Sequence, residues 1–281
     1  MKKLLSLVFA AGFGFLFFNS NAIAGYLDNY ANITIYDKNS SQSSGWNGPQ
    51  EDQEVEPGAV TGQEWDLEGF FAYDSMLALV GGYDLQYGED GILPGDVYID
   101  VDGDAKYGPI NNGTGYNNTE VTNNFGYDYV LDIDHSSTTP TYSVFELIDG
   151  TSKNITVTYQ QMQASNPWLY SSGGTQVAGA GGTTGYLTDL TNTALGLDGS
   201  SALKGKDESL TSNDHNMMTF DLSFLPGGTI YTAHYTMECG NDALMGSGST
   251  AAVPEPATIF LLGSGLLGLF GFRKKIRKTD S

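Results

Sequence analysis

The sequence predicts an all-β fold, an antiparallel β-sandwich or jelly roll, on the basis of three observations. Apolar and polar side chains alternate with a period of two through most of the chain. Glycine, asparagine, serine and aspartate fill the joints between these stretches, and helix is expected only as a turn near residues 187–196. Many short strands separated by turns are typical of sandwiches and jelly rolls. The expected strands are residues 31–36, 65–73, 76–85, 95–102, 127–134, 141–147, 154–159, 217–224 and 229–238.

The length between the two ends suits one large all-β domain or two small ones, and we expect a single domain over residues 25–240. Residues 38–63 and 171–185 are low in complexity and are expected to be long loops. Residues 241–252 are rich in small side chains, so we expect a linker there.

The first 24 residues have the three-part layout of a secretory signal peptide. Lys2 and Lys3 precede an apolar stretch that runs through Phe18, and Ala22 and Ala24 form a small-residue exit before Gly25. A buried first helix is the alternative. The layout favours export by the secretion machinery, with a mature chain that begins at or near Gly25.

The charge of the chain is strongly negative, with 12 basic and 33 acidic residues and a formal net charge of −21. Only five basic residues, against 31 acidic ones, lie between Gly25 and Val253. Nucleic acid and anionic lipid surfaces would repel such a body, so a nucleic-acid partner is excluded.

The C-terminal segment differs from the rest of the chain. Residues 257–272 carry no charge and, as a helix, would cover most of the roughly 30 Å hydrocarbon core of a membrane. A basic tail over residues 273–281 follows. Basic residues next to a membrane helix stay on the cytoplasmic side, so the acidic body should lie outside.

The triplet Pro254-Glu255-Pro256, the apolar segment and the basic end resemble the PEP-CTERM sorting signal of Gram-negative exopolysaccharide producers. The resemblance covers residues 253–281 and implies that a membrane-bound exosortase cuts near the triplet. The mature protein would then leave the inner membrane for the outer surface or the extracellular matrix. A permanent membrane anchor is the alternative. The expected signal residues are Val253, Pro254, Glu255, Pro256, Arg273, Lys274 and Lys275.

The stretch around Asp100, Asp102 and Asp104 resembles the start of a calcium loop, in which alternate carboxylates converge on a hard cation. The match is incomplete, because Ala105 and Asn111 stand where calcium loops have glycine and a bidentate acid. Asp128, Asp132 and Asp134 share one face of a second expected strand, and their carboxylates could complete a calcium site if the two strands lie close together; Asp132 and Asp134 are the residues assigned to it. A solvated acidic turn is the equal alternative.

Trp46 and Trp168 lie near glycine and proline in expected loops and are candidates for stacking on sugar rings. Ordinary loop packing is the alternative, because tryptophan is usually mostly buried. Trp65 begins an expected strand and is assigned to the core. Cys239 has no second cysteine with which to form an internal disulfide, so it is either a buried small residue or a thiol that forms an intermolecular bridge or is reactive.

The chain shows none of the hydrolase, zinc-protease or phosphate-loop motifs that would identify an enzyme. We therefore expect a non-catalytic surface or matrix protein that is structural or associated with extracellular polysaccharide. The alternative is a carbohydrate-binding or carbohydrate-active protein with a calcium-supported sandwich.

Overall fold

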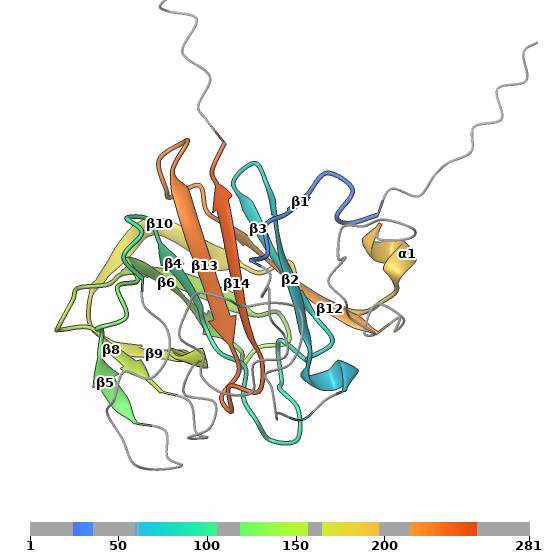
Figure 1. The fold of residues 1–281 in the computed structure, drawn as a ribbon, viewed down its shortest axis with the longest axis horizontal. Coiled ribbons are helices and arrows are strands. Elements are labelled where there is room, and N and C mark those ends of the chain that lie inside the picture. Colours follow the sequence, from blue (N-terminus) through green and yellow to red (C-terminus); the bar gives the residue numbers. More distant parts are fainter. Residues whose placement is uncertain are drawn as a thin grey trace, which may run out of the picture.

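The fold is described from a computed structural model that covers residues 25–35, 60, 62–105, 119–156, 165–196 and 214–251 (Figure 1). These residues form antiparallel sheets with only two short helical elements, η1 (Gln63–Trp65) and α1 (Asn192–Leu195). The predicted all-β, antiparallel class is therefore confirmed. The predicted signal peptide (1–24) and the predicted C-terminal helix and tail (257–281) lie outside the described residues.

The first sheet, sheet A, has five strands and pairs antiparallel throughout. Its strand order is β1 (Ala31–Asn32), β2 (Leu67–Tyr73), β3 (Met76–Gly81), β12 (His215–Asp221) and β11 (Leu187–Leu190).

The second sheet, sheet B, has six strands that are also antiparallel. Its strand order is β10 (Thr175–Thr183), β7 (Thr141–Glu146), β6 (Tyr129–Asp134), β4 (Val97–Asp100), β13 (Ile230–Thr236) and β14 (Ala243–Ser249). A small third sheet contains β5 (Glu120–Thr122), β8 (Lys153–Ile155) and β9 (Leu169–Ser172).

The main hydrophobic core lies between sheets A and B. Alternate residues of each strand point into it, which is the period-two pattern seen in the sequence. Sheet A contributes residues such as Phe70 and Leu79, and sheet B contributes residues such as Ile99 and Leu131, all fully buried.

The outer faces of both sheets are partly covered as well. The segment before β1 and helix α1 cover sheet A, where Leu27 and Leu195 pack with Phe71. The third sheet and its connections cover part of sheet B, where Val121 packs with Tyr98. Strands β2, β3 and β4 are therefore buried on both faces.

Strand β1 and the residues after it join the two sheets along one side. The Ile33 N–H donates to the Phe70 carbonyl in sheet A, and the Ile35 N–H donates to the Met245 carbonyl in sheet B, each at 2.9 Å. This segment thereby covers the open edge of β14 at its middle.

The prediction of a linker over residues 241–252 is wrong, because β14 occupies Ala243–Ser249 and most of it is buried. Its small side chains are needed for close packing. A β-carbon added at Gly246 would lie 2.8 Å from the β-carbon of Phe70, which is below normal contact distance. The domain therefore extends to at least Thr250, whose N–H donates to the Thr229 carbonyl at 2.9 Å.

The prediction of a loop over residues 171–185 is also wrong, because most of this stretch is strand β10 at the edge of sheet B. Its register with β7 slips between Gln176 and Gly181, so the intervening residues bulge away from the ladder. Gly179 and Gly181 adopt positive φ angles of 78° and 95°, which side-chain-bearing residues rarely adopt.

The packing of β14 can be tested with Gly246→Val. We expect this substitution to lower the free energy of unfolding by about 1–3 kcal/mol, because the added side chain clashes with Phe70. Urea unfolding would measure the change. The matched control is Ser247→Val on the exposed face of the same strand, which should change stability by no more than about 0.5 kcal/mol. Equal effects of the two substitutions would contradict this packing.

Candidate functional site

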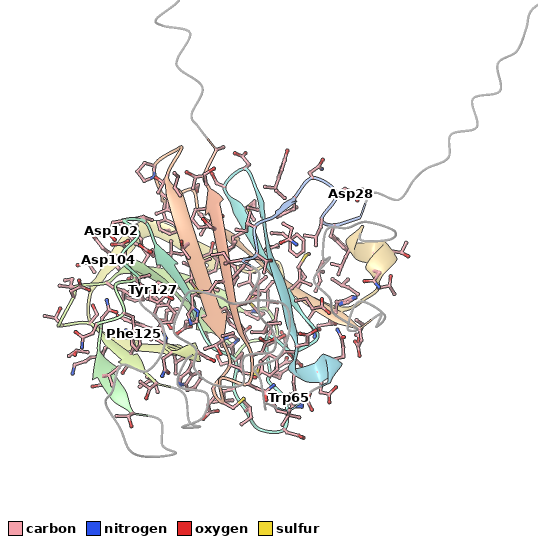
Figure 2. The ribbon with its side chains drawn as sticks, in the orientation of Figure 1. Asp28, Trp65, Asp102, Asp104, Phe125 and Tyr127 are labelled. Atoms are coloured by element: carbon pink, nitrogen blue, oxygen red, sulfur yellow. The ribbon has the colours of Figure 1, made fainter. Side chains whose placement is uncertain are left out.

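The acidic turn, defined here by Asp100, Asp102 and Asp104, follows strand β4. One carboxylate oxygen from each residue lies within 4.8 Å of the others. Asp100 is buried, whereas Asp102 and Asp104 are exposed at the edge of the molecule (Figure 2). Three carboxylates at this separation could bind a hard cation such as calcium.

The carboxylates of the acidic turn also bind the backbone of the turn itself. Asp100 Oδ1 accepts hydrogen bonds from the N–H groups of Asp102 and Gly103, at 3.1 and 2.8 Å. Asp100 Oδ2 accepts one from Ala105 at 3.3 Å, and Asp102 Oδ1 accepts one from Asp104 at 3.2 Å. Asp100 therefore stabilises the turn whether or not a cation binds.

Asp128 adds a further carboxylate beside the turn. Its Oδ2 accepts a hydrogen bond from the Val101 N–H at 2.6 Å. Burial, followed by the charges of Asp102 and Asp100, raises the pKa of Asp128. The pKa of Asp104 is raised chiefly by Asp102. Negative charge is therefore concentrated at this turn.

The prediction that Asp132 and Asp134 complete the calcium site is wrong. The antiparallel register pairs Ile99 with Tyr129 and Val97 with Leu131, so Asp132 lies beside the start of β4. Four residues of strand, or about 13 Å, separate its position from that of Asp100. Of the three carboxylates expected from this strand, only Asp128 lies beside the acidic turn, because the beginning of one antiparallel strand lies beside the end of the next.

The prediction that Trp168 is available to a sugar is also wrong, because this side chain is only 2% exposed. Its indole Nε1–H donates to the Thr156 carbonyl at 2.9 Å, and its own carbonyl accepts from the Asp96 N–H at 2.8 Å. Trp65 belongs to the main core, as expected, and Trp46 lies outside the described residues.

Two buried aspartates that the sequence analysis did not single out bind backbone groups of neighbouring strands. The carboxylate of Asp96 accepts hydrogen bonds from the N–H groups of Ile133 and Tyr170, at 2.8 and 2.7 Å. Asp242 Oδ2 accepts one from Leu67 at 2.6 Å. Burial, and then the charge of Asp132, raises the pKa of Asp96 well above its usual value. These carboxylates connect elements of the fold.

A buried polar cluster surrounds His215 at the start of β12. His215 Nδ1 lies 2.8 Å from Glu68 Oε1, and His215 Nε2 lies 2.9 Å from Asn192 Oδ1. The Gln63 amide also donates to Glu68 Oε1, at 2.7 Å. Glu68 reaches this position from an irregularity in the pairing of β2 with β3. Each ring nitrogen of His215 lies within hydrogen-bonding distance of a side-chain oxygen, and the ring is fully buried. Neither nitrogen is therefore available to a substrate.

His234 and Cys239 are buried too. Burial lowers the pKa of His234 to about 4, so its ring is neutral at physiological pH. Burial raises the pKa of Cys239 to about 11, which keeps the thiol protonated and unreactive. Cys239 therefore fits the interpretation of a buried small residue.

A hollow of about 230 Å³ opens beside the bulge of β10. Residues 177–181 line one side of it, and Asp221, Ser223 and Phe224 line the other. It combines an aromatic ring, a carboxylate, a hydroxyl group and exposed glycine backbone. No pattern in the sequence indicates this hollow, because the two segments that line it are far apart in the chain.

The predicted sorting residues, Val253 to Pro256 and Arg273 to Lys275, lie outside the described residues. Within the described ranges, no helix is long and apolar enough to cross a membrane. The described chain ends at Ala251, directly after the last strand.

Comparison with known proteins identifies the C-terminal segment. Residues 252–278 match the family described as the PEP-CTERM protein-sorting motif, which was the resemblance seen in the sequence. No curated protein and no solved structure gives a significant match to the chain.

Calcium binding at the acidic turn remains a prediction, and a thermal melt can test it. Millimolar calcium should raise the melting temperature more than sodium at equal ionic strength, since sodium screens charge but does not coordinate. A ligand at a hundredfold excess over its Kd stabilises the native state by roughly 2.7 kcal/mol. Magnesium should do less, because it gives up its waters reluctantly.

Two variants separate coordination from general screening. Asp102→Asn should remove most of the calcium-specific increase, because Asp102 is part of the acidic turn. Asp134→Asn removes the same charge outside the turn and should leave that increase unchanged. If calcium and sodium give the same melting temperature, the turn is only a solvated acidic loop.

Proposed function

We propose that this chain, which carries a PEP-CTERM sorting motif at residues 252–278, is a non-catalytic surface or matrix protein that an exosortase processes. The motif indicates export, with a C-terminus anchored in the membrane before processing. After processing, the β-domain would be displayed at the outer surface or in the extracellular matrix. The motif match is the single observation that carries this proposal.

The position of the motif relative to the fold supports processing. The match begins at residue 252, and Thr250 is the last of the described residues whose N–H is bonded into the domain. A cut near Pro254-Glu255-Pro256 would therefore leave every described strand intact. Each proline fixes φ and lacks an N–H donor, so the two prolines favour an extended segment, which would suit recognition by a protease.

The state of the titratable side chains supports a non-catalytic role. His215 is fully buried with both ring nitrogens in contact, and burial keeps the His234 ring neutral and the Cys239 thiol protonated. Each of these would be a natural choice for a base or nucleophile. In the described part of the domain, His215 belongs to a buried hydrogen-bonded cluster, and His234 and Cys239 are packed in the interior.

The processing step can be tested by replacing Pro254, Glu255 and Pro256 with alanine in the producing bacterium. We expect full-length protein to accumulate in the inner membrane, because the exosortase no longer recognises it. Membrane fractionation and mass spectrometry of both termini would measure this, with a wild-type mature chain ending near residues 253–256.

The control is Pro226→Ala, which removes an exposed proline in the β12–β13 loop and should leave processing unchanged. A wild-type surface fraction that retains Arg273 to Lys278 would show a permanent anchor instead, and the proposal would fail.

Association with extracellular polysaccharide is a second candidate function, and the hollow beside β10 favours it. Phe224 offers a ring face for a sugar, and Asp221 and Ser223 offer hydrogen-bonding groups. Because Trp168 is buried, the residues that line this hollow are the candidates for contact with a sugar.

Retention on the native polysaccharide would test this second candidate. Phe224→Ala and Asp221→Asn should each weaken retention, because each removes a group that lines the hollow. Tyr87→Ala is the control, since Tyr87 is 60% exposed and does not line the hollow. Release of reducing ends by the purified protein would indicate an enzyme, whereas neither retention nor turnover would leave a purely structural role.

A further inference from the structure

The end of the domain at which the chain leaves β14 forms one continuous surface, which we call the exit face. It consists of the β2–β3 turn (73–75), the β12–β13 loop and first residue of β13 (222–230), and residues 249–251. The end of β14 and the β2–β3 turn lie together at the top of Figure 1. The Leu222 N–H donates to the Ser75 carbonyl at 2.7 Å, which joins the first two segments.

The third segment of the exit face is fixed to the β12–β13 loop. The Thr250 N–H donates to the Thr229 carbonyl at 2.9 Å, and the Gly228 N–H donates to the Thr250 carbonyl at 3.2 Å. The Thr250 hydroxyl also donates to the Pro226 carbonyl at 2.7 Å. The point at which the chain leaves the domain is therefore held in one position.

The distance from this point to the predicted membrane segment is short. Six residues, 251–256, separate Thr250 from the uncharged run that begins at Ala257. Even fully extended, this connection spans only about 24 Å. A domain of this size has a radius of gyration of about 17 Å, so the connection is shorter than the domain is wide. An anchored chain must therefore hold its exit face toward the membrane.

The side chains of the exit face suit a membrane interface. Ile230 is 71% exposed, more than any other large apolar side chain among the described residues. Tyr73 is 51% exposed, and its ring centroid lies 5.8 Å from that of Tyr30. Tyrosine is enriched where protein meets lipid headgroups, because it has an apolar ring and a polar tip.

The charge of the exit face differs from that of the whole domain. Residues 222–230 contain no acidic or basic side chain. Asp74 is the only acid of the exit face, and Asp221 flanks it. Headgroup phosphates would repel most other surfaces of so acidic a domain. Approach to a membrane therefore meets little charge repulsion at this end.

We infer that the exit face rests against the lipid headgroups while the C-terminus is anchored, with Ile230 and Tyr73 as its lipid contacts. The inference rests on the proposed function, since it concerns the anchored precursor. It gives the domain a fixed orientation beside the membrane before processing, with residues 252–256 confined between the domain and the lipid surface.

Site-specific fluorescence on the full chain can test the contact. Ile230→Cys would be labelled with an environment-sensitive dye in one protein and Leu93→Cys in another. Leu93 is a matched control, because it is also apolar and 52% exposed. The carbonyl of Leu93 accepts a hydrogen bond from the N–H of Glu238. Glu238 lies eight residues after Ile230 along the chain, which is about 26 Å of extended strand toward the opposite end of the domain. Cys239 is buried and its raised pKa protects it from labelling.

The labelled chains would be reconstituted into phosphatidylcholine vesicles that contain lipid with a nitroxide on its headgroup. We expect vesicles to quench the dye at position 230 and shift its emission to the blue, and to leave the dye at position 93 unchanged. Ser249→Cys, exposed and paired with Ile230, provides a second reporter if the first variant does not fold. Adding Tyr73→Ser should reduce the quenching at position 230.

Flotation of the vesicles separates the two proposals. Chains that float with the vesicles but show equal quenching at positions 230 and 93 would overturn the lipid contact and leave the proposed function intact. Chains that do not float would contradict the anchored precursor, on which both proposals depend.

Discussion

The fold depends on buried carboxylates that bind backbone N–H groups. The chain between Gly25 and Val253 is rich in acids, and Lys153 is the only lysine or arginine among the described residues. Its partner, Glu120, lies 3.7 Å away at the surface. Buried acids in the described part of the domain therefore have no such cation to pair with. Asp96 and Asp242 accept backbone hydrogen bonds instead, which stabilise the charged form and connect neighbouring strands.

Because these acids are buried or lie close to other acids, the stability contributed by them should fall as the pH rises. Burial, together with neighbouring acids, raises the pKa of Asp96, Asp128 and Asp132 in the folded state. An acid whose pKa is raised by folding contributes stability below its unfolded pKa, near 3.8, and that contribution is lost as the pH rises through the raised value. These carboxylates therefore become a cost as the pH rises through their raised pKa values, and the hydrophobic core offsets that cost. A cation at the acidic turn would act against the same repulsion.

The alternating pattern predicted most strands, because one buried face imposes a period of two wherever large apolar residues face the core. It missed the short strands β5, β9 and β11, and it missed β10 and β14, where small residues occur for packing reasons that are not visible locally. Gly246 is small because Phe70 lies against it, and Phe70 is 176 residues earlier in the chain.

The acidic turn could be predicted because its three residues lie close together in the sequence. The sequence also placed Asp128, Asp132 and Asp134 on one face of a second strand, but it did not show which of them lies beside Asp100, because that depends on the antiparallel direction of this strand. Trp168 looked like a loop residue, but its indole hydrogen bond to Thr156 and its burial depend on distant contacts.

The position of the sorting motif follows from the role of β14. This strand pairs with β13 over seven residues, from Ala243 to Ser249, and packs against β2, so the domain cannot close without it. Asp242, directly before β14, also binds the Leu67 N–H of β2. A cut before Thr250 would remove at least this buried residue and its hydrogen bonds to the β12–β13 loop, whereas a cut after Ala251 removes none of the described residues. The motif begins at residue 252, the first position at which the chain can be severed without loss of the fold. The same arrangement leaves almost no spacer, so the compact end of the β-domain, and not a flexible tether, would meet the membrane and the processing enzyme.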